Sequence, residues 1–120
     1  MDNLEIFFSE DSELSEFEAI NKGCRLDVFV KMHQAIYHVR LYTFIRLQQD
    51  FEDAIEEDGY YCPDPNIILI KEANKEEIVS AIKWLSKQCY FSQLKNLSGV
   101  DVDRLMKFQN IDINKLVKIQ

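Results

Sequence analysis

Residues 44–70 constrain the fold most, because a long helical pattern runs directly into a short and wholly apolar segment. Thr43 can cap the N-terminus of this helix, and Gly59 can adopt the left-handed conformation that ends it. The apolar run 67–70 is typical of a strand buried on both faces. The stretch therefore predicts a helix that packs on a sheet and leads to a buried strand. The expected buried stripe recurs at helical spacing and consists of Phe44, Leu47, Phe51, Ala54 and Ile55.

The opposite face of this helix is acidic almost without interruption. Like charges three or four residues apart destabilise a helix by about 0.2–0.5 kcal/mol each. Glu57 and Asp58 lie at the C-terminal end, where the helix dipole disfavours negative charge. Tyr60 and Tyr61 follow at once, and tyrosine is a preferred anchor of interfaces, although packing over the sheet edge explains these two equally well. The face is thus either a solvated surface or a binding surface for a basic partner; its acids are Asp50, Glu52, Asp53, Glu56, Glu57 and Asp58.

Acidic residues are concentrated in two segments of the chain. Residues 1–21 and 50–64 each contain seven acids and no base, whereas residues 22–49 and 65–120 are net basic. The total net charge of −7 disfavours nucleic acid or an anionic membrane as a partner and favours a basic protein. We therefore take the candidate partner-binding residues from both acidic segments: Asp50, Asp53, Glu56, Glu57, Asp58, Tyr60, Tyr61, Glu10, Asp11 and Glu13.

The remaining periodicity predicts three further strands and a second helix. Alternating apolar residues indicate a strand at 4–8 and two antiparallel neighbours at 25–32 and 37–42. Between the first two strands lies an acidic connection in which Leu14 and Phe17 could anchor one helical turn. Asn74, with a glutamate three residues later, predicts the start of the second helix. Its buried stripe would be Ile78, Ala81, Ile82 and Leu85.

The C-terminal residues contain an internal repeat. Residues 100–109 match residues 111–120 position by position, with a period of eleven. Each copy fits either a short capped turn that buries Leu105 or Leu116, or an extended segment. Two copies are too few for a solenoid, so we expect residues 98–120 to form a packed extension.

The predicted fold class is α+β, in one domain that spans residues 1–120. A chain of this length with 47% hydrophobic residues can bury a core of its own. The element order β-β-β-α-β-α predicts a mainly antiparallel sheet of about four strands in residues 1–97, with the helices packed on one face. A right-handed connection through the acidic helix would place the fourth strand parallel to the third.

No catalytic, cofactor-binding or metal-binding motif can be identified. His33 and His38 lack further ligands at metal-binding spacing, and the three cysteines are scattered. We expect the cysteines to be small buried residues with reduced thiols; Cys62 is the most exposed candidate nucleophile, and no neighbour in sequence activates it. No segment is apolar enough to span a bilayer, and the first residues lack a basic signal region. We expect a cytoplasmic protein that is not an enzyme and holds no cofactor or metal. Because acidic residues are abundant, the sequence does not exclude a hydrolase that uses a pair of carboxylates.

Two passages of the chain resemble a known group of proteins. They are LEIFFSEDSELSE near the N-terminus and FEDAIEEDGYYCPDPNIILI at 51–70. In a small acidic α+β domain, they resemble the small cytoplasmic immunity proteins of bacterial contact-dependent inhibition and related polymorphic-toxin systems. The resemblance implies a non-enzymatic inhibitor that covers the active site or substrate surface of a cognate toxin domain, often a basic nuclease. Because these immunity proteins share no invariant motif, it assigns no individual contact residue.

Two other functions are compatible with the sequence. A nucleic-acid mimic, such as an inhibitor from a phage or mobile element, would need carboxylates along much of its surface, whereas residues 65–120 are net basic. A small enzyme or ligand-binding domain with a carboxylate site would need a concave pocket where acidic side chains converge. The shape of the acidic surface therefore discriminates between these functions.

Overall fold

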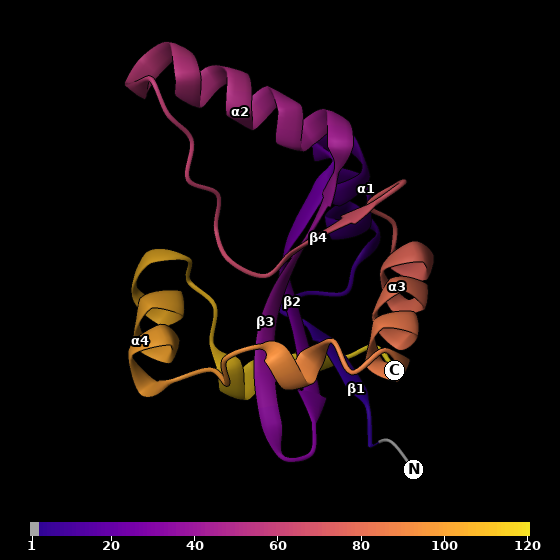
Figure 1. Ribbon diagram of the computed structural model, residues 1–120. Coiled ribbons are helices and arrows are strands. Elements are labelled where there is room, and N and C mark those ends of the chain that lie inside the picture. Colours follow the sequence, from indigo (N-terminus) through magenta and orange to yellow (C-terminus); the bar gives the residue numbers. More distant parts are fainter. Residues whose placement is uncertain (1–2) are drawn as a thin grey trace.

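A computed structural model describes residues 3–120, which form a five-stranded mixed sheet and four α-helices (Figure 1). The sheet order is β4-β3-β2-β1-β5. The strands are β1 (Glu5–Phe8), β2 (Cys24–Met32), β3 (Ala35–Thr43), β4 (Ile67–Ile70) and β5 (Val117–Lys118). The helices are α1 (Glu13–Lys22), α2 (Phe44–Asp58), α3 (Lys75–Lys87) and α4 (Gly99–Phe108), with short 3-10 turns η1 (Phe91–Gln93) and η2 (Ile113–Lys115). The α+β class is confirmed, with a fifth strand that sequence reasoning did not predict.

Strands β2 and β3 form the predicted antiparallel hairpin, which is the longest pairing in the sheet. His33 and Gln34 form the turn between the two strands, and their φ angles of 53° and 67° are both positive. Two-residue hairpin turns with positive φ at both positions have a twist that matches the twist of the strands they join. The register shifts between Arg25 and Val28, so a bulge interrupts the alternation. Leu26 is consequently exposed, although strict alternation along 25–32 predicts that it shares the buried face with Val28 and Val30.

Strand β4 pairs with β3 in parallel, as the right-handed connection predicted; Leu41 lies opposite Ile68. The expectation that β4 is buried on both faces is wrong. The strand lies at the edge of the sheet, where Ile68 is buried, Ile70 packs partly buried against the core and Leu69 is exposed. A continuous apolar run is typical of a buried strand, but it does not distinguish a central position from an edge.

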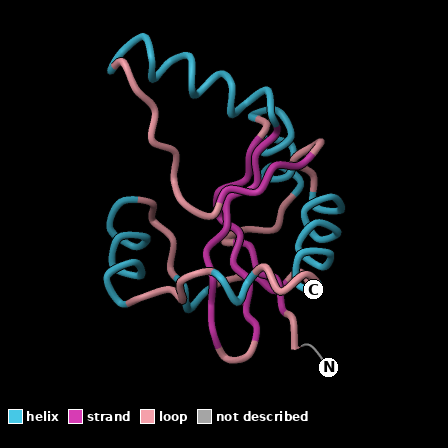
Figure 2. The backbone as a smooth tube through the Cα atoms, viewed as in Figure 1, coloured by secondary structure: helices cyan, strands magenta, loops and turns pink. Residues whose placement is uncertain are grey.

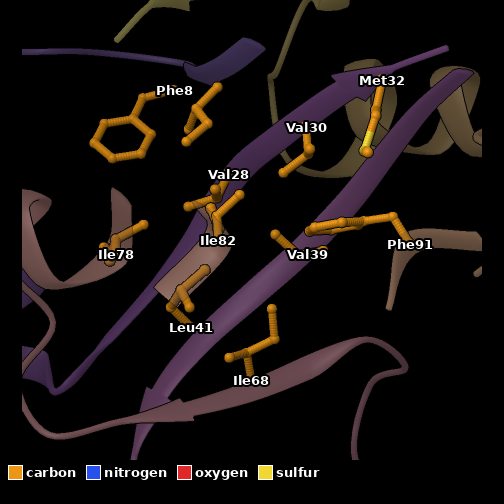
Figure 3. Packing of buried hydrophobic residues seen from close by; sticks show 11 residues of the cluster. Phe8, Val28, Val30, Met32, Val39, Leu41, Ile68, Ile78, Ile82 and Phe91 are labelled. Carbon is orange, nitrogen blue, oxygen red and sulfur yellow. The ribbon is translucent and has the colours of Figure 1, made fainter. Parts of the chain in front are cut away.

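The two faces of the sheet carry separate cores. On one face, Ile78 and Ile82 of α3 pack with Phe91 against residues of β1 to β4 (Figure 3). On the other face, Phe29 packs with Leu105 of α4 and with Ile111. Figure 1 shows α3 and α4 on opposite sides of the sheet. The prediction that the helices share one face is therefore wrong, because the C-terminal residues cover the second face.

The two copies of the eleven-residue repeat adopt different structures. The first copy forms α4, whose N-terminus has a capping box between Ser98 and Asp101. The second copy forms η2 and then β5, which pairs with β1 through Phe8 and Val117. The first copy is thus a longer helix than the predicted short turn, whereas the second copy contains both a capped turn and an extended segment. Only the second copy pairs with the edge of β1.

Helix α1 is a full ten-residue helix and not the single turn that the sequence predicted. It begins with a Ser12–Ser15 capping box and ends at Gly23 with φ of 75°. Leu14 and Phe17 do not anchor it, because their exposed fractions are 64% and 62%. Ala19 is its buried residue instead.

Helix α2 has the predicted bounds and both predicted caps. The Thr43 hydroxyl accepts a hydrogen bond from the Arg46 backbone N–H at 3.2 Å, and Gly59 has φ of 82°. None of its fifteen residues is buried, however. Phe44, Phe51 and Ile55 are 59%, 49% and 41% exposed, so the predicted packing of this stripe on the core is wrong.

The reason for the exposure of α2 is its position in the chain. It follows β3 without a linker and extends beyond the end of the sheet, and a long loop returns the chain to β4 (Figure 2). The helix thus has little of the sheet beneath it. Within residues 3–120, no helix combines the length and apolar content that crossing a membrane requires.

Candidate partner-binding surface

The C-terminal half of α2 and the loop that follows it enclose an open groove of about 350 Å³, here called the acidic groove. Its walls include four carboxylates of the helix, one carboxylate of the loop and two tyrosine rings. Helical spacing directs the carboxylates inward, and the loop folds back beneath them. The predicted residues that the structure brings together here are Asp50, Asp53, Glu57, Asp58 and Tyr61.

One of these carboxylates is already neutralised. Arg46 Nε donates to Asp50 Oδ1 at 2.9 Å, one turn away on α2. Arg46 Nη1 also donates to the carbonyl oxygen of Lys22, at the end of α1, at 3.1 Å. Arg46 therefore ties the start of α2 to the end of α1, and Asp50, which is paired with Arg46, has little charge left for a partner.

The other carboxylates of the helix are free to act at long range. Within residues 3–120, no Lys, Arg or His nitrogen lies within 4.0 Å of the carboxylates of Asp53, Glu56, Glu57 or Asp58. Glu56 is exposed but lies outside the acidic groove. Uncompensated charges of one sign on one helix produce a local negative potential that attracts cations.

Burial and negative charge keep the tyrosines of the groove protonated. Burial raises the pKa of Tyr42 to about 12, with further increases from Cys24 and Asp50. Burial, followed by the charges of Asp50 and Asp64, also raises the pKa of Tyr61. Both phenols therefore remain neutral at physiological pH and can donate hydrogen bonds.

The two tyrosines predicted as anchors have different environments. Tyr60 is 69% exposed and lies outside the acidic groove. Tyr61 lies edge-on to Phe51, with ring centroids 6.2 Å apart. Tyr60 is thus available to a partner as it stands, whereas Tyr61 also holds the loop against α2.

The N-terminal acids do not join this surface. Asp11 forms an ion pair with Lys75 of α3 at 2.8 Å. The Glu10 carboxylate accepts a hydrogen bond from the Ser12 hydroxyl at 2.6 Å, and Glu13 lies in the first turn of α1. Because the opposite end of α1 meets α2, these three acids lie away from the acidic groove. The structure therefore does not bring them together with the acids of α2, and their role in binding a partner stays a prediction.

Exposed apolar residues lie on α2 and α1, and sequence reasoning assigned several of them to the core. On α2 these are Phe44, Ile45, Phe51 and Ile55; α1 adds Leu14 and Phe17. Helical periodicity revealed the stripe on α2, but it does not indicate what covers such a stripe. The surface therefore combines free carboxylates with exposed apolar side chains and one exposed tyrosine, a composition typical of a protein interface.

The histidines and cysteines have different environments. In residues 3–120, no group of three or more His, Cys, Asp and Glu side chains is arranged to hold a metal ion. His38 is buried, stacks on Phe29 and places Nε2 2.6 Å from the Leu26 carbonyl oxygen. Cys24 is buried as expected, whereas Cys62 and Cys89 are exposed, so the prediction of burial is wrong for these two. Residues that close turns and loops, such as these two, often lie at the surface.

The chain matches no protein-family model, and comparisons with curated proteins and with solved structures give no significant match.

Proposed function

We propose that this protein is an inhibitor of the immunity type, which binds a basic toxin domain through α2 and the acidic groove and thereby neutralises it. The partner surface would be an active site or substrate cleft lined by Lys and Arg. The inhibitor would act in the cytoplasm by occlusion, without chemistry of its own. Its contact residues would be Asp53, Glu56, Glu57, Asp58, Tyr60 and the exposed apolar residues of α2.

The single observation that carries this proposal is the exposure of α2. A fifteen-residue helix with no buried residue combines uncompensated carboxylates with Phe44, Phe51 and Ile55 at 59%, 49% and 41% exposure. Completing the burial of each of these side chains in a complex would contribute roughly 1 kcal/mol, about half the value for full burial. A partner that covers the helix would thus supply the packing that the sheet does not.

The two kinds of side chain would act on different rates. Free carboxylates steer a cationic partner, so the association rate should fall as salt rises across the Debye range. Apolar and aromatic contacts mainly oppose dissociation, so Tyr60→Ala should release the partner faster with little change in association. The resemblance to immunity proteins favours a nuclease as the toxin, since a nuclease presents a basic substrate surface.

The groove supports a second candidate, a ligand-binding domain with a carboxylate site. The acidic groove is shallow and open, with the carboxylates of Asp53, Glu57 and Asp64 around a volume of about 350 Å³. A small polyamine is the class of ligand that such a groove would accept. Saturable binding of spermidine that Glu57→Gln abolishes would favour this candidate over the inhibitor.

The proposed function is tested with a toxin domain encoded beside this gene. The double variant Glu57→Lys/Asp58→Lys should lose protection of cells that express the toxin, and the purified pair should associate more slowly. A matched control, Glu72→Lys/Asp103→Lys, reverses two exposed charges elsewhere and should protect as well as the wild type. Protection and binding that survive the α2 double reversal would refute the role of this surface.

A further inference from the structure

A second concave site lies on the same side of the sheet as α4, and its charge is opposite to that of the acidic groove. This cavity, here called the basic cleft, has a volume of about 430 Å³ and lies between β3, α4 and the loop before β4. Cationic side chains enter it from three separate parts of the chain: Arg40 of β3, Lys95 of the segment after η1, and Arg104 of α4. In a chain with a net charge of −7, such convergence needs an explanation.

Arg40 is largely buried, but its charge is only loosely paired. Its side chain is 14% exposed, and Nε lies 3.6 Å from a carboxylate oxygen of Asp64, whose side chain is 64% exposed. Nη1 donates to the Pro65 carbonyl oxygen at 3.0 Å. The guanidinium thus keeps donor capacity toward the cleft, since five N–H groups are available to it.

Lys95 and Arg104 are less compensated still. Within residues 3–120, neither forms an ion pair at 4.0 Å or less. The nearby Asp101 carboxylate is committed to the cap of α4, where it accepts hydrogen bonds from the Ser98 backbone N–H at 2.9 Å and hydroxyl at 2.7 Å. The cleft therefore presents three cations and two carboxylates: that of Asp64, which is weakly held by Arg40, and that of Asp101, which accepts hydrogen bonds from Ser98.

We propose that the basic cleft is a binding site for the phosphate group of a small molecule. Two guanidinium groups can each offer a pair of parallel N–H donors to an oxyanion, and the lysine adds a third positive charge. A volume of about 430 Å³ falls within the range of small-molecule sites. Asp64 opposes an anion, but its exposed side chain can turn toward solvent when phosphate replaces it beside Arg40.

This site is independent of the proposed function. The cleft shares only Asp64 and the adjoining prolyl loop with the region below α2, and none of its three cations belongs to the acidic groove. Loss of toxin binding would leave the anion site unaffected, and the reverse is also true. The protein would then carry two surfaces of opposite sign, one for a protein and one for a small anion.

The test is a titration of the isotope-labelled protein with inorganic phosphate at constant ionic strength, with sodium chloride as the balancing salt. We expect saturable NMR shifts of the Arg40 and Arg104 side-chain N–H signals and of the Asn66 side-chain amide, which lines the cleft. Arg104→Gln should weaken the affinity by about tenfold to a hundredfold, as the loss of charge-assisted hydrogen bonds predicts. Lys95→Gln should weaken it less.

Lys107→Gln provides the matched control, because it removes one positive charge from the same helix outside the cleft. This variant should bind phosphate as the wild type does. Arg104 and Lys107 are both exposed, so neither change should unfold the protein. Shifts that rise linearly without saturation, or equal affinities in Arg104→Gln and Lys107→Gln, would overturn the proposal.

Discussion

The rings of Phe51 and Tyr61 meet edge-on, with centroids 6.2 Å apart and planes inclined at 75°. This pair joins the projecting helix to the loop that returns to the sheet. Such an aromatic contact is typically worth about 0.5–1.5 kcal/mol. About half of the surface of Phe51 faces solvent.

Phe51 should therefore contribute less to stability than a residue of the core. We expect Phe51→Ala to lower the free energy of unfolding by roughly 1 kcal/mol, because the side chain is already about half exposed. Ile68→Ala, in the buried cluster, should cost about 2–5 kcal/mol. Urea denaturation of the two variants measures both values, and a larger loss for Phe51→Ala would mean that α2 packs more tightly than its exposed fractions indicate.

Reversing the charge at the end of α2 should not weaken the free protein. Glu57→Lys/Asp58→Lys replaces repulsion between Asp53 and Glu57 with attraction and places positive charge at the favourable end of the helix dipole. The melting temperature should stay the same or rise by up to about 4 °C. Asp50→Lys is the contrasting control, since it breaks the 2.9 Å pair with Arg46 and should lower the melting temperature. A clear loss of stability in the double variant would contradict this account.

His38 should make the fold sensitive to mild acid. Burial lowers the pKa of His38 from its ordinary value of 6.5; the neighbouring Arg40 lowers it further, while the Leu26 carbonyl and Asp27 partly oppose the shift. The unfolded state therefore binds more protons than the folded state once the pH falls below about 6.5. The free energy of unfolding should be at its full value above pH 6.5 and fall as the pH drops toward the lowered folded pKa.

The measurement is the urea midpoint as a function of pH. His38→Gln should flatten the profile between pH 6.5 and about 5, whereas the exposed His33→Gln should leave it unchanged. Equal slopes in the two variants would show that other groups control this pH range.

Gly23 should be the glycine least tolerant of substitution. Its φ is 75°, and an added Cβ would lie 2.7 Å from the hydroxyl oxygen of Thr43, the residue that caps α2. Gly59 has a similar φ of 82° but open space around it. Gly59→Ala should cost about 1 kcal/mol of strain, and Gly23→Ala about 1–2 kcal/mol more, because the capping side chain must also move. Chemical denaturation compares the two, and equal costs would exclude the steric contribution.

Local signals in the sequence predicted the elements that depend on local interactions. The β2–β3 hairpin follows from alternation, α3 from the Asn74 cap and its apolar stripe, and the bounds of α2 from Thr43 and Gly59. These features arise from propensity and capping within a few residues. They were therefore accessible without a structure.

Non-local interactions decided the features that were predicted wrongly. An apolar run at Ile67–Ile70 did not show that the strand would be an edge, and an apolar stripe on α2 did not show that nothing would cover it. The two repeat copies diverge because one finds a serine cap and the other a free strand edge. For the candidate site, charge density located the acids of α2, but only the fold separates Asp11, held by Lys75, from them.

The direct junction between β3 and α2 has a thermodynamic consequence. Thr43 is both the last residue of the strand and the cap of the helix, its backbone N–H donates to the Gly23 carbonyl oxygen at 2.8 Å, and Arg46 bonds to Lys22. The helix is consequently held at its base with its direction already set. A partner would meet a preorganised surface, so binding would forfeit little conformational entropy, and affinity could be high for an interface of modest area.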